Sequence, residues 1–544
     1  MEKYTEKGDG NRFLVENYAM KRLRRLIPNT VFVAIIALAI VGCAGTPPHT
    51  PLEPGATNSA QDNAVFATGY GAISRKYIDP VRIADIAING LDGFAAIDPA
   101  LRIERVAGRI VMKLDGAAIA EAPAPEADNA QDWAKLTTAF SLQARRHSLL
   151  MHKASAEKVY EAVFDGVLSD LDIFSRYAGA EEAKMNRARR DGFGGIGIRF
   201  RIKKGKAVVT EVMPETPAAE TGLKIADQIT HVDGEPLSKP KVRQVVKRLR
   251  GPTQSTVKVR VYRPSADHSL DMTLERRHII SPTVRASRHG DILKLRISGF
   301  NQATARTMAA ALERANDEAK TLGRLKGIVL DLRGNPGGLL KQSVKLADLV
   351  LTHGLIISTR GRHPDSPHYY EAGGRDITDG LPIAVLVDGK SASASEIVAA
   401  ALQDRDRAVL IGTSSFGKGS VQTVIRLPND GEITLTWSRF VAPSGYILHG
   451  LGVRPGICTS GSPADIDTLV QSALARHLAA RKTYASWRIP GARESADRKL
   501  LRDTCPPQRH KTDLEFKIAK HVLGDRQLYT QALDLSSATH QARH

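Results

Sequence analysis

Cysteine is scarce in this chain, with three among 544 residues. The sequence has neither a cysteine cluster nor an H-E-x-x-H motif, so we predict no metal and no cofactor. Basic motifs interleaved with aromatic side chains are also missing, although the formal net charge is +19. Because the basic residues are scattered, the sequence argues against nucleic acid as a partner. The composition, 42% hydrophobic and 25% charged, is that of a globular protein long enough for about two or three domains.

The main apolar run near the N-terminus is short, at about twelve residues (30–41), which suits a signal segment better than a membrane-spanning helix. A basic stretch, Lys21–Arg25, precedes it, and Ile40-Val41-Gly42-Cys43 ends it. This ending resembles the lipobox of bacterial lipoproteins, in which the cysteine receives the lipid. We therefore expect Cys43 to anchor a periplasm-facing protein in the membrane of a bacterial envelope. An uncleaved anchor helix is the alternative, and Met20 is a candidate start.

Two cysteines remain once Cys43 is assigned to the lipid. An oxidising compartment allows a disulfide between Cys458 and Cys505. Two free thiols fit the sequence equally well, so the pairing stays open at this level.

The periodicity of apolar residues predicts a multidomain α/β protein. The N-terminal region is mainly helical, with a candidate hairpin around Asp115-Gly116 and one long helix over residues 132–152. Short alternating strands and two helices then predict a small β-sandwich that resembles a PDZ domain at Gly222–Ile229 and Val232-Asp233-Gly234. Apolar strands alternating with helices follow and predict a buried sheet. The expected divisions are a signal segment (1–43), a linker (44–62), the helical region (63–190), the PDZ-like domain (191–276), the α/β catalytic domain (279–460) and a helical extension (461–544).

Two glycine motifs suggest nucleotide binding at first sight, and both fail on context. Gly192–Gly197 fits G-x-G-x-x-G, but the residues after it are strand-like, whereas a dinucleotide fingerprint needs a helix there. Gly412–Gly419 nearly fits the phosphate-binding loop, but Gly419 stands where a magnesium-binding hydroxyl is required. Lys418 within this motif therefore needs another explanation.

The segment Val387–Glu396 is the strongest candidate for chemistry. A buried strand ends, turns at Asp388-Gly389 and enters a helix of small residues, which presents a hydroxyl beside free backbone N–H groups. Taken alone, Ser393-x-x-Glu396 is better explained as a helix capping box than as a nucleophile. A serine nucleophile also needs a base, and Lys418 can serve only if its environment keeps the amine neutral. Taken alone, a lysine in a Phe-Gly-Lys-Gly turn is a solvated surface group.

The ordered set of motifs changes that balance, because it resembles the C-terminal processing peptidases, also called tail-specific proteases. The resemblance covers about residues 156–460. It is carried by Phe164-Asp165-Gly166, Leu171-Asp172, Ser175-Arg176-Tyr177, the PDZ-like domain, Asp331–Gly338, Ser391–Glu396, Phe416–Gln422, Pro443-Ser444-Gly445 and His449–Pro455.

The resemblance implies a serine endopeptidase with a Ser–Lys dyad. Ser393 would be the nucleophile, Lys418 the general base and Gln422 the residue that orients the lysine. The N–H of Ala394 and one N–H from Gly337 or Gly338 would form the oxyanion hole. Ser391 and Ser395 are read as structural, and Arg333 and Asn335 as residues that hold their loop. The PDZ-like loop Gly194-Gly195-Ile196-Gly197 would hold the C-terminal carboxylate of a protein tail.

Some features depart from the family pattern or leave alternatives open. Asp172-Ile173 stands where Asp-Pro is usual, and residues 100–150 match no family motif. A non-catalytic PDZ lipoprotein that only captures tails is the main alternative function. A penicillin-binding type of Ser–Lys enzyme is the other, but that class carries S-x-x-K on one helix. A homo-oligomer or an adaptor protein as a partner is left open.

Overall fold

The computed structural model describes residues 59–461, 465–489, 495–509 and 513–536. Cys43 and most of the expected linker therefore lie outside the described residues. Among the helices that are described, none combines the length and the apolar character needed to cross a bilayer.

The N-terminal region packs four helices around buried aromatic side chains, among them Phe66, Trp133 and Phe164. The helices are α1 (Ser59–Lys76), α2 (Ile83–Asp92), α3 (Ala130–His147) and α5 (Ala156–Leu168). The expected turn at Asp115-Gly116 is confirmed, and it joins two strands of a three-stranded sheet: β1 (Leu101–Val106), β2 (Arg109–Leu114) and β3 (Ala117–Pro123).

The single helix expected over residues 132–152 is wrong, because the chain breaks at Ser148. This residue is extended, with φ −109° and ψ 124°. Its hydroxyl accepts a hydrogen bond from the N–H of Met151 and donates one to Asp98, so it caps a new short helix, α4 (Leu149–Lys153).

The PDZ-like region forms an antiparallel sheet in the order β11-β10-β8-β7-β6, with β9 (Glu235–Pro236) beside β8. Its helix α8 (Val242–Leu249) buries Val245 and Leu249 against this sheet. The short helix α7 (Pro217–Glu220) buries Ala218 in the same core. A two-stranded ladder joins β5 (Phe193–Gly195) to β12 (Arg277–Ile279). The main strands are β6 (Ile198–Lys203), β7 (Lys206–Val212), β8 (Gln228–Val232), β10 (Thr256–Arg263) and β11 (His268–Glu275).

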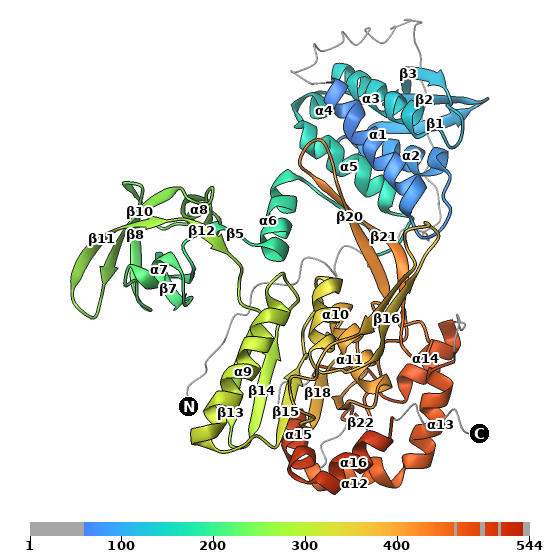
Figure 1. Cartoon of the computed structure of the whole chain (residues 1–544). Coiled ribbons are helices and arrows are strands. Elements are labelled where there is room, and N and C mark those ends of the chain that lie inside the picture. Colours follow the sequence, from blue (N-terminus) through green and yellow to red (C-terminus); the bar gives the residue numbers. More distant parts are fainter. Residues whose placement is uncertain (1–58, 462–464, 490–494, 510–512, 537–544) are drawn as a thin grey trace, which may run out of the picture. The chain divides into compact units, whose positions relative to one another are not determined.

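The sheet expected after residue 279 is present (Figure 1), and its central strands are buried on both faces. All of its neighbouring strands are parallel except the first pair. Ile328 and Leu330 point to the core under α9, α10 and α11, whereas Val329 points to the core under α12, α15 and α16. The strands in spatial order are β13 (Val284–His289), β14 (Ile292–Ile297), β15 (Gly327–Asp331), β18 (Ile383–Val387), β19 (Ala408–Gly412) and β22 (Ile457–Cys458).

The helices on the first face are α9 (Thr304–Leu322), α10 (Leu340–Asp348) and α11 (Ala394–Asp404). Those on the second face are α12 (Ile466–Ala475), α15 (Leu514–Gly524) and α16 (Arg526–Asp534). The C-terminal helices are therefore part of the α/β layers, because they cover apolar strand positions that would otherwise face water.

A second, antiparallel sheet joins the N-terminal region to the α/β layers, and the sequence did not predict it. Its path is β17-β16-β21-β20, and β4 (Arg176–Ala178) of the N-terminal region pairs with β21. The other members are β16 (Gly354–Arg360), β17 (His368–Ala372), β20 (Ser420–Arg426) and β21 (Glu432–Val441).

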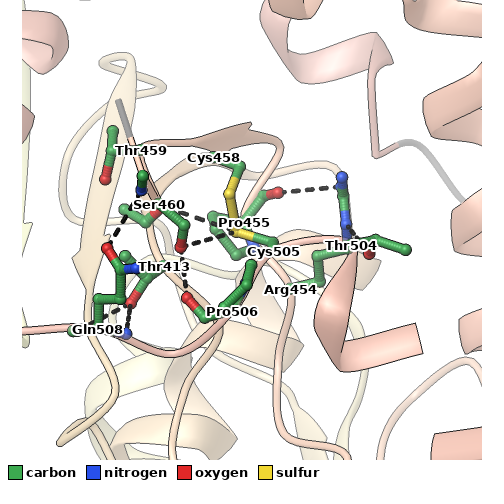
Figure 2. Close-up of a disulfide and its surroundings, with 12 residues drawn as sticks. Thr413, Arg454, Pro455, Cys458, Thr459, Ser460, Thr504, Cys505, Pro506 and Gln508 are labelled. Atoms are coloured by element: carbon green, nitrogen blue, oxygen red, sulfur yellow. Dashed lines mark hydrogen bonds between the residues drawn. A yellow bond between two sulfur atoms is a disulfide. The ribbon is translucent and has the colours of Figure 1, made fainter. Parts of the chain in front are cut away.

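Cys458 and Cys505 are joined by a disulfide, which fastens the segment after α14 (Ser495–Asp503) to the end of β22 (Figure 2). We call residues 495–508 the C-terminal strap. The carbonyl of Gln508 in this strap accepts hydrogen bonds from the N–H of Gly389 and from the hydroxyl of Thr413. Arg502 donates to the carbonyl oxygens of Leu451 and Ser415. The strap thus packs against the loops that follow β18 and β19.

Candidate active site

Ser393 occupies a strained turn between β18 and α11. Its φ is 55° and its ψ is −114°, a conformation that a non-glycine residue adopts only when its surroundings enforce it. The hydroxyl of Ser391 donates to the carbonyl of Leu332, and that of Ser395 donates to the carbonyl of Asn335. Both of these serines are fully buried, whereas Ser393 is partly exposed. Of the three serines, only Ser393 is accessible to a substrate.

Glu396 is a buried carboxylate that ties this turn to the loop of Lys418. Its Oε2 accepts hydrogen bonds from the N–H of Ser393 at 2.7 Å and from the N–H of Lys418 at 2.9 Å. Its Oε1 accepts from the hydroxyl of Ser415 at 2.5 Å and from the N–H of Gly417 at 2.6 Å. Burial raises the pKa of Glu396, and the four donors oppose that rise. All four contacts are donors, so the site is built for the ionised carboxylate.

The glycine pair after β15 packs directly against the Ser393 turn. A Cβ on Gly337 would stand 2.7 Å from the carbonyl oxygen of Ala392 and 3.0 Å from the nitrogen of Ala394, so no larger residue fits. The N–H of Gly337 already donates to the side chain of Asn335. Within the described residues, no hydrogen bond engages the N–H groups of Gly338 and Ala394. Two unused donors therefore lie beside Ser393.

Two side chains hold the glycine loop in place. The guanidinium of Arg333 contacts the carboxylates of Asp331 and Glu515, and it is 11% exposed. The amide of Asn335 bonds to the carbonyl of Ile297 and to the N–H of Gly337, and the residue is fully buried. Both residues hold the loop, as the sequence indicated.

Lys418 lies in a loop before β20, as the strand-like sequence after it predicted. Within the described residues no carboxylate forms an ion pair with its amine, and the amine lies 4.8 Å from the centroid of the Phe174 ring. Burial, aided by the charge of Arg176, lowers the pKa of Lys418, and Asp172 and Glu396 act against this shift. The amine of Lys418 is thus shielded from solvent, unlike that of a solvated surface lysine.

Gln422 lies on β20, two positions beyond Ser420 on the same side of the strand. Its amide nitrogen donates to the hydroxyl of Ser420 at 2.8 Å and to that of Thr436 at 3.3 Å. No hydrogen bond between Gln422 and Lys418 is present in the described residues. The structure therefore connects Gln422 to Ser420 on its own strand and to Thr436 on β21.

The PDZ-like glycines divide into two parts. Gly194 and Gly195 pair with β12, and the carbonyl of Gly194 accepts from the N–H of Gly251. Ile196 is buried, and Gly197 has φ +85° and packs on Thr216. A cavity of about 510 Å³ opens beside them, lined by α6 (Ala180–Asp191), the turn at Gly192–Gly194, and residues of α8 and after it, including Val246 and Arg250. Strand β6 follows the loop, so the dinucleotide interpretation fails, as predicted.

Sequence reasoning missed two parts of this site. Glu396 was read only as a capping residue, because its contacts with residues 415–418 are not visible in the local pattern. The segment Asp172–Arg176 was noted only within the family resemblance, and the structure places its Phe174 ring at Lys418.

Comparison with known proteins agrees with this geometry. The model of peptidase family S41 matches residues 291–459, and a PDZ domain model matches residues 194–274. A carboxy-terminal-processing protease of Bartonella bacilliformis is 40% identical over 302 residues, which is 55% of this chain and 69% of that protein. The chain therefore belongs to peptidase family S41. Its class is that of the carboxy-terminal-processing serine proteases with a PDZ domain.

Two further similar proteins have lower sequence identity to the chain. A probable CtpA-like serine protease of Staphylococcus aureus is 30% identical over 333 residues, which is 60% of this chain and 66% of that protein. Among solved structures, the photosystem II D1 C-terminal processing protease is 22% identical, covers 72% of this chain and 92% of its own, and has a TM-score of 0.37.

Proposed function

We propose that the chain is an envelope endopeptidase that binds protein C-terminal tails in its PDZ domain and cuts them with Ser393 and Lys418. The observation that carries the proposal is the shared Oε2 of Glu396, which accepts from the backbone N–H of both residues. A strained, accessible hydroxyl and a shielded lysine are thereby fixed to one atom. This arrangement suits a nucleophile with a neutral amine as its base.

The proposed reaction is acyl transfer in two halves. The neutral amine of Lys418 takes the proton of the Ser393 hydroxyl while Oγ attacks the peptide carbonyl. The N–H groups of Ala394 and Gly338 stabilise the oxyanion, since that of Gly337 is used by Asn335. The Lys418 ammonium then protonates the leaving amine, and water activated by the same lysine releases the acyl group. Gln422 would orient the lysine once substrate is bound.

Substrate choice is proposed to rest on the PDZ domain. A tail would enter as an added strand, with its carboxylate on backbone N–H groups of the loop Gly194–Gly197. The N–H groups of Ile196 and Gly197 have no hydrogen-bond partner within the described residues. Phe193 and Val246 give the adjoining cavity apolar surface for the last side chain of the tail.

A reporter protein with an apolar tail tests this substrate choice. We expect cleavage of the free-carboxylate form, and a fall in kcat/KM of roughly tenfold to a hundredfold when the carboxylate is amidated, since a charge-assisted contact is lost. The measurement is cleavage rate against reporter concentration. Equal rates for both forms would refute tail recognition while leaving the chemistry intact, and binding without any cutting would favour the scaffold alternative.

Membrane anchoring is proposed from the sequence ending in Cys43. The wild-type protein should incorporate a labelled fatty acid and partition into detergent, whereas Cys43→Ala should do neither. Cys458→Ser, at a cysteine engaged in the disulfide, is the matched control and should still be labelled. An unlabelled wild-type protein that still sediments with membranes would point instead to the uncleaved helix.

A further inference from the structure

The active site includes a residue of the N-terminal region that the proposed mechanism does not use. The Phe174 ring faces the amine of Lys418, with 4.8 Å between the amine nitrogen and the ring centroid. The same ring meets the imidazole of His449 edge-on, with 6.1 Å between ring centroids and 83° between planes. Phe174 therefore covers one side of the site, although it belongs to the N-terminal region and not to the α/β layers.

The position of Phe174 is fixed by a compact hydrogen-bonded turn. The carboxylate of Asp172 accepts from the N–H groups of Phe174 and Ser175 and from the hydroxyl of Ser175. This turn is bound to β21, because the N–H of Thr436 donates to the hydroxyl of Ser175 and the hydroxyl of Thr436 donates to Asp172.

The same threonine connects the turn to the lysine loop. The hydroxyl of Thr436 also accepts from the amide of Gln422 on β20, the strand that begins two residues after Lys418. The network therefore connects the turn that carries the Phe174 ring to the strand that follows Lys418. These hydrogen bonds link Asp172 to Gln422 through Thr436, and the Ser–Lys dyad alone does not account for them.

We propose that Phe174 is a positioning residue for the general base: its ring excludes water from one side of the Lys418 amine and so favours the uncharged form. The inference rests on the proposed role of Lys418. An aromatic face attracts an ammonium ion, but it solvates that ion less well than water does. Replacing water by the ring therefore favours the neutral amine, which is the form that takes the proton from Ser393.

The charged groups around Lys418 shift its pKa in opposite directions, so the apolar surface that buries the amine has a larger influence on the net shift. Arg176 favours the neutral amine, whereas Asp172 and Glu396 favour the ammonium. His449 faces the same ring, and burial together with Arg439 and Arg498 lowers its pKa, against a smaller effect of Asp172. Burial has the largest effect on the pKa of Lys418, and the face of the Phe174 ring lies over that amine, with 4.8 Å between the nitrogen and the ring centroid.

The test is the pH dependence of kcat/KM in Phe174→Ala and Phe174→Leu. Because the base works only when neutral, activity rises with pH through the pKa of Lys418. Water admitted by Phe174→Ala should move this acidic limb to higher pH, lowering the ratio of kcat/KM at about pH 7 to that at about pH 9.5 by roughly threefold to tenfold. Phe174→Leu keeps an apolar cover without an aromatic face, and should keep the wild-type limb.

Ile173→Ala is the matched control, because Ile173 lies in the same turn and its side chain is 83% exposed. It should leave the limb in place. A loss in Phe174→Ala that is equal at every pH would show a merely structural role and overturn the inference, as would an unchanged profile or a leucine variant that shifts like the alanine one. An active Lys418→Ala variant would instead refute the proposed dyad, so the two failures are distinguishable.

Discussion

Replacing Ser393 by alanine is expected to lower kcat by at least about 10⁴-fold, because it removes the hydroxyl that forms the acyl intermediate. The neighbouring serines cannot substitute, since their hydroxyls are buried and donate to main-chain carbonyls. Lys418→Ala should cost about 10²–10⁴-fold, the range of a general base. Both variants should still bind a tailed reporter, because the PDZ domain is unchanged, so reporter binding and single-turnover cleavage are measured together.

Lys390→Ala is the matched control for the lysine. Lys390 lies in the same turn as Ser393 but is exposed, and its N–H, not its side chain, contacts Asp388. We expect wild-type turnover from this variant. Cleavage by Ser393→Ala at the wild-type rate would exclude Ser393 as the nucleophile.

Glu396→Gln is expected to have the next largest effect, on both stability and turnover. The amide can accept through only one atom, so two of the four donors that now face the carboxylate would meet an N–H₂ group instead. Each buried donor left without an acceptor costs about 1–3 kcal/mol of unfolding free energy. With the amide nitrogen at the Oε2 position, Ser393 and Lys418 would lose their shared acceptor; with it at the Oε1 position, Ser415 and Gly417 in the lysine loop would lose theirs. A displacement of about 1 Å between reacting groups costs roughly 100-fold in kcat.

Thermal unfolding and steady-state kinetics measure the two effects of Glu396→Gln separately. Glu371→Gln, at an exposed position on β17, is the control and should change neither. A variant that is destabilised but keeps full kcat below its melting temperature would show that Glu396 holds the fold without aligning the dyad.

The parallel strands were predictable because burial on both faces leaves uniform apolar runs such as Ile383–Val387, which the structure confirms as β18. The sheet containing β16, β20 and β21 was not predicted. Strand β20 mixes buried and exposed positions, and β21 mixes buried and half-buried ones, so neither gives a uniform apolar run. The partners in this sheet are also far apart in sequence, as in the pairing of Thr434 with Arg176.

The residues of the active site also divide into those that local sequence motifs identify and those that depend on tertiary packing. Ser393 and Lys418 could be proposed because ordered local motifs carry them. The link through Glu396, and the contact of Asp172 with Thr436 across 264 positions, depend on tertiary packing that no local pattern encodes. At Ser148 the sequence pattern predicted too much: the apolar periodicity continues past this residue, but its side chain caps a new helix and so ends the one before it.

The C-terminal strap supports the loops of the active site, and it is synthesised after them. Gly389 and Thr413, in the loops after β18 and β19, are held by Gln508, and Ser415 is held by Arg502. During synthesis, Ser393 and Lys418 leave the ribosome before the strap does. At that stage the chain still lacks this support and the helices that cover the second face of the sheet. The loops after β18 and β19 therefore gain these contacts only once residues 495–508 have been synthesised, and the disulfide joins the same residues to the end of β22.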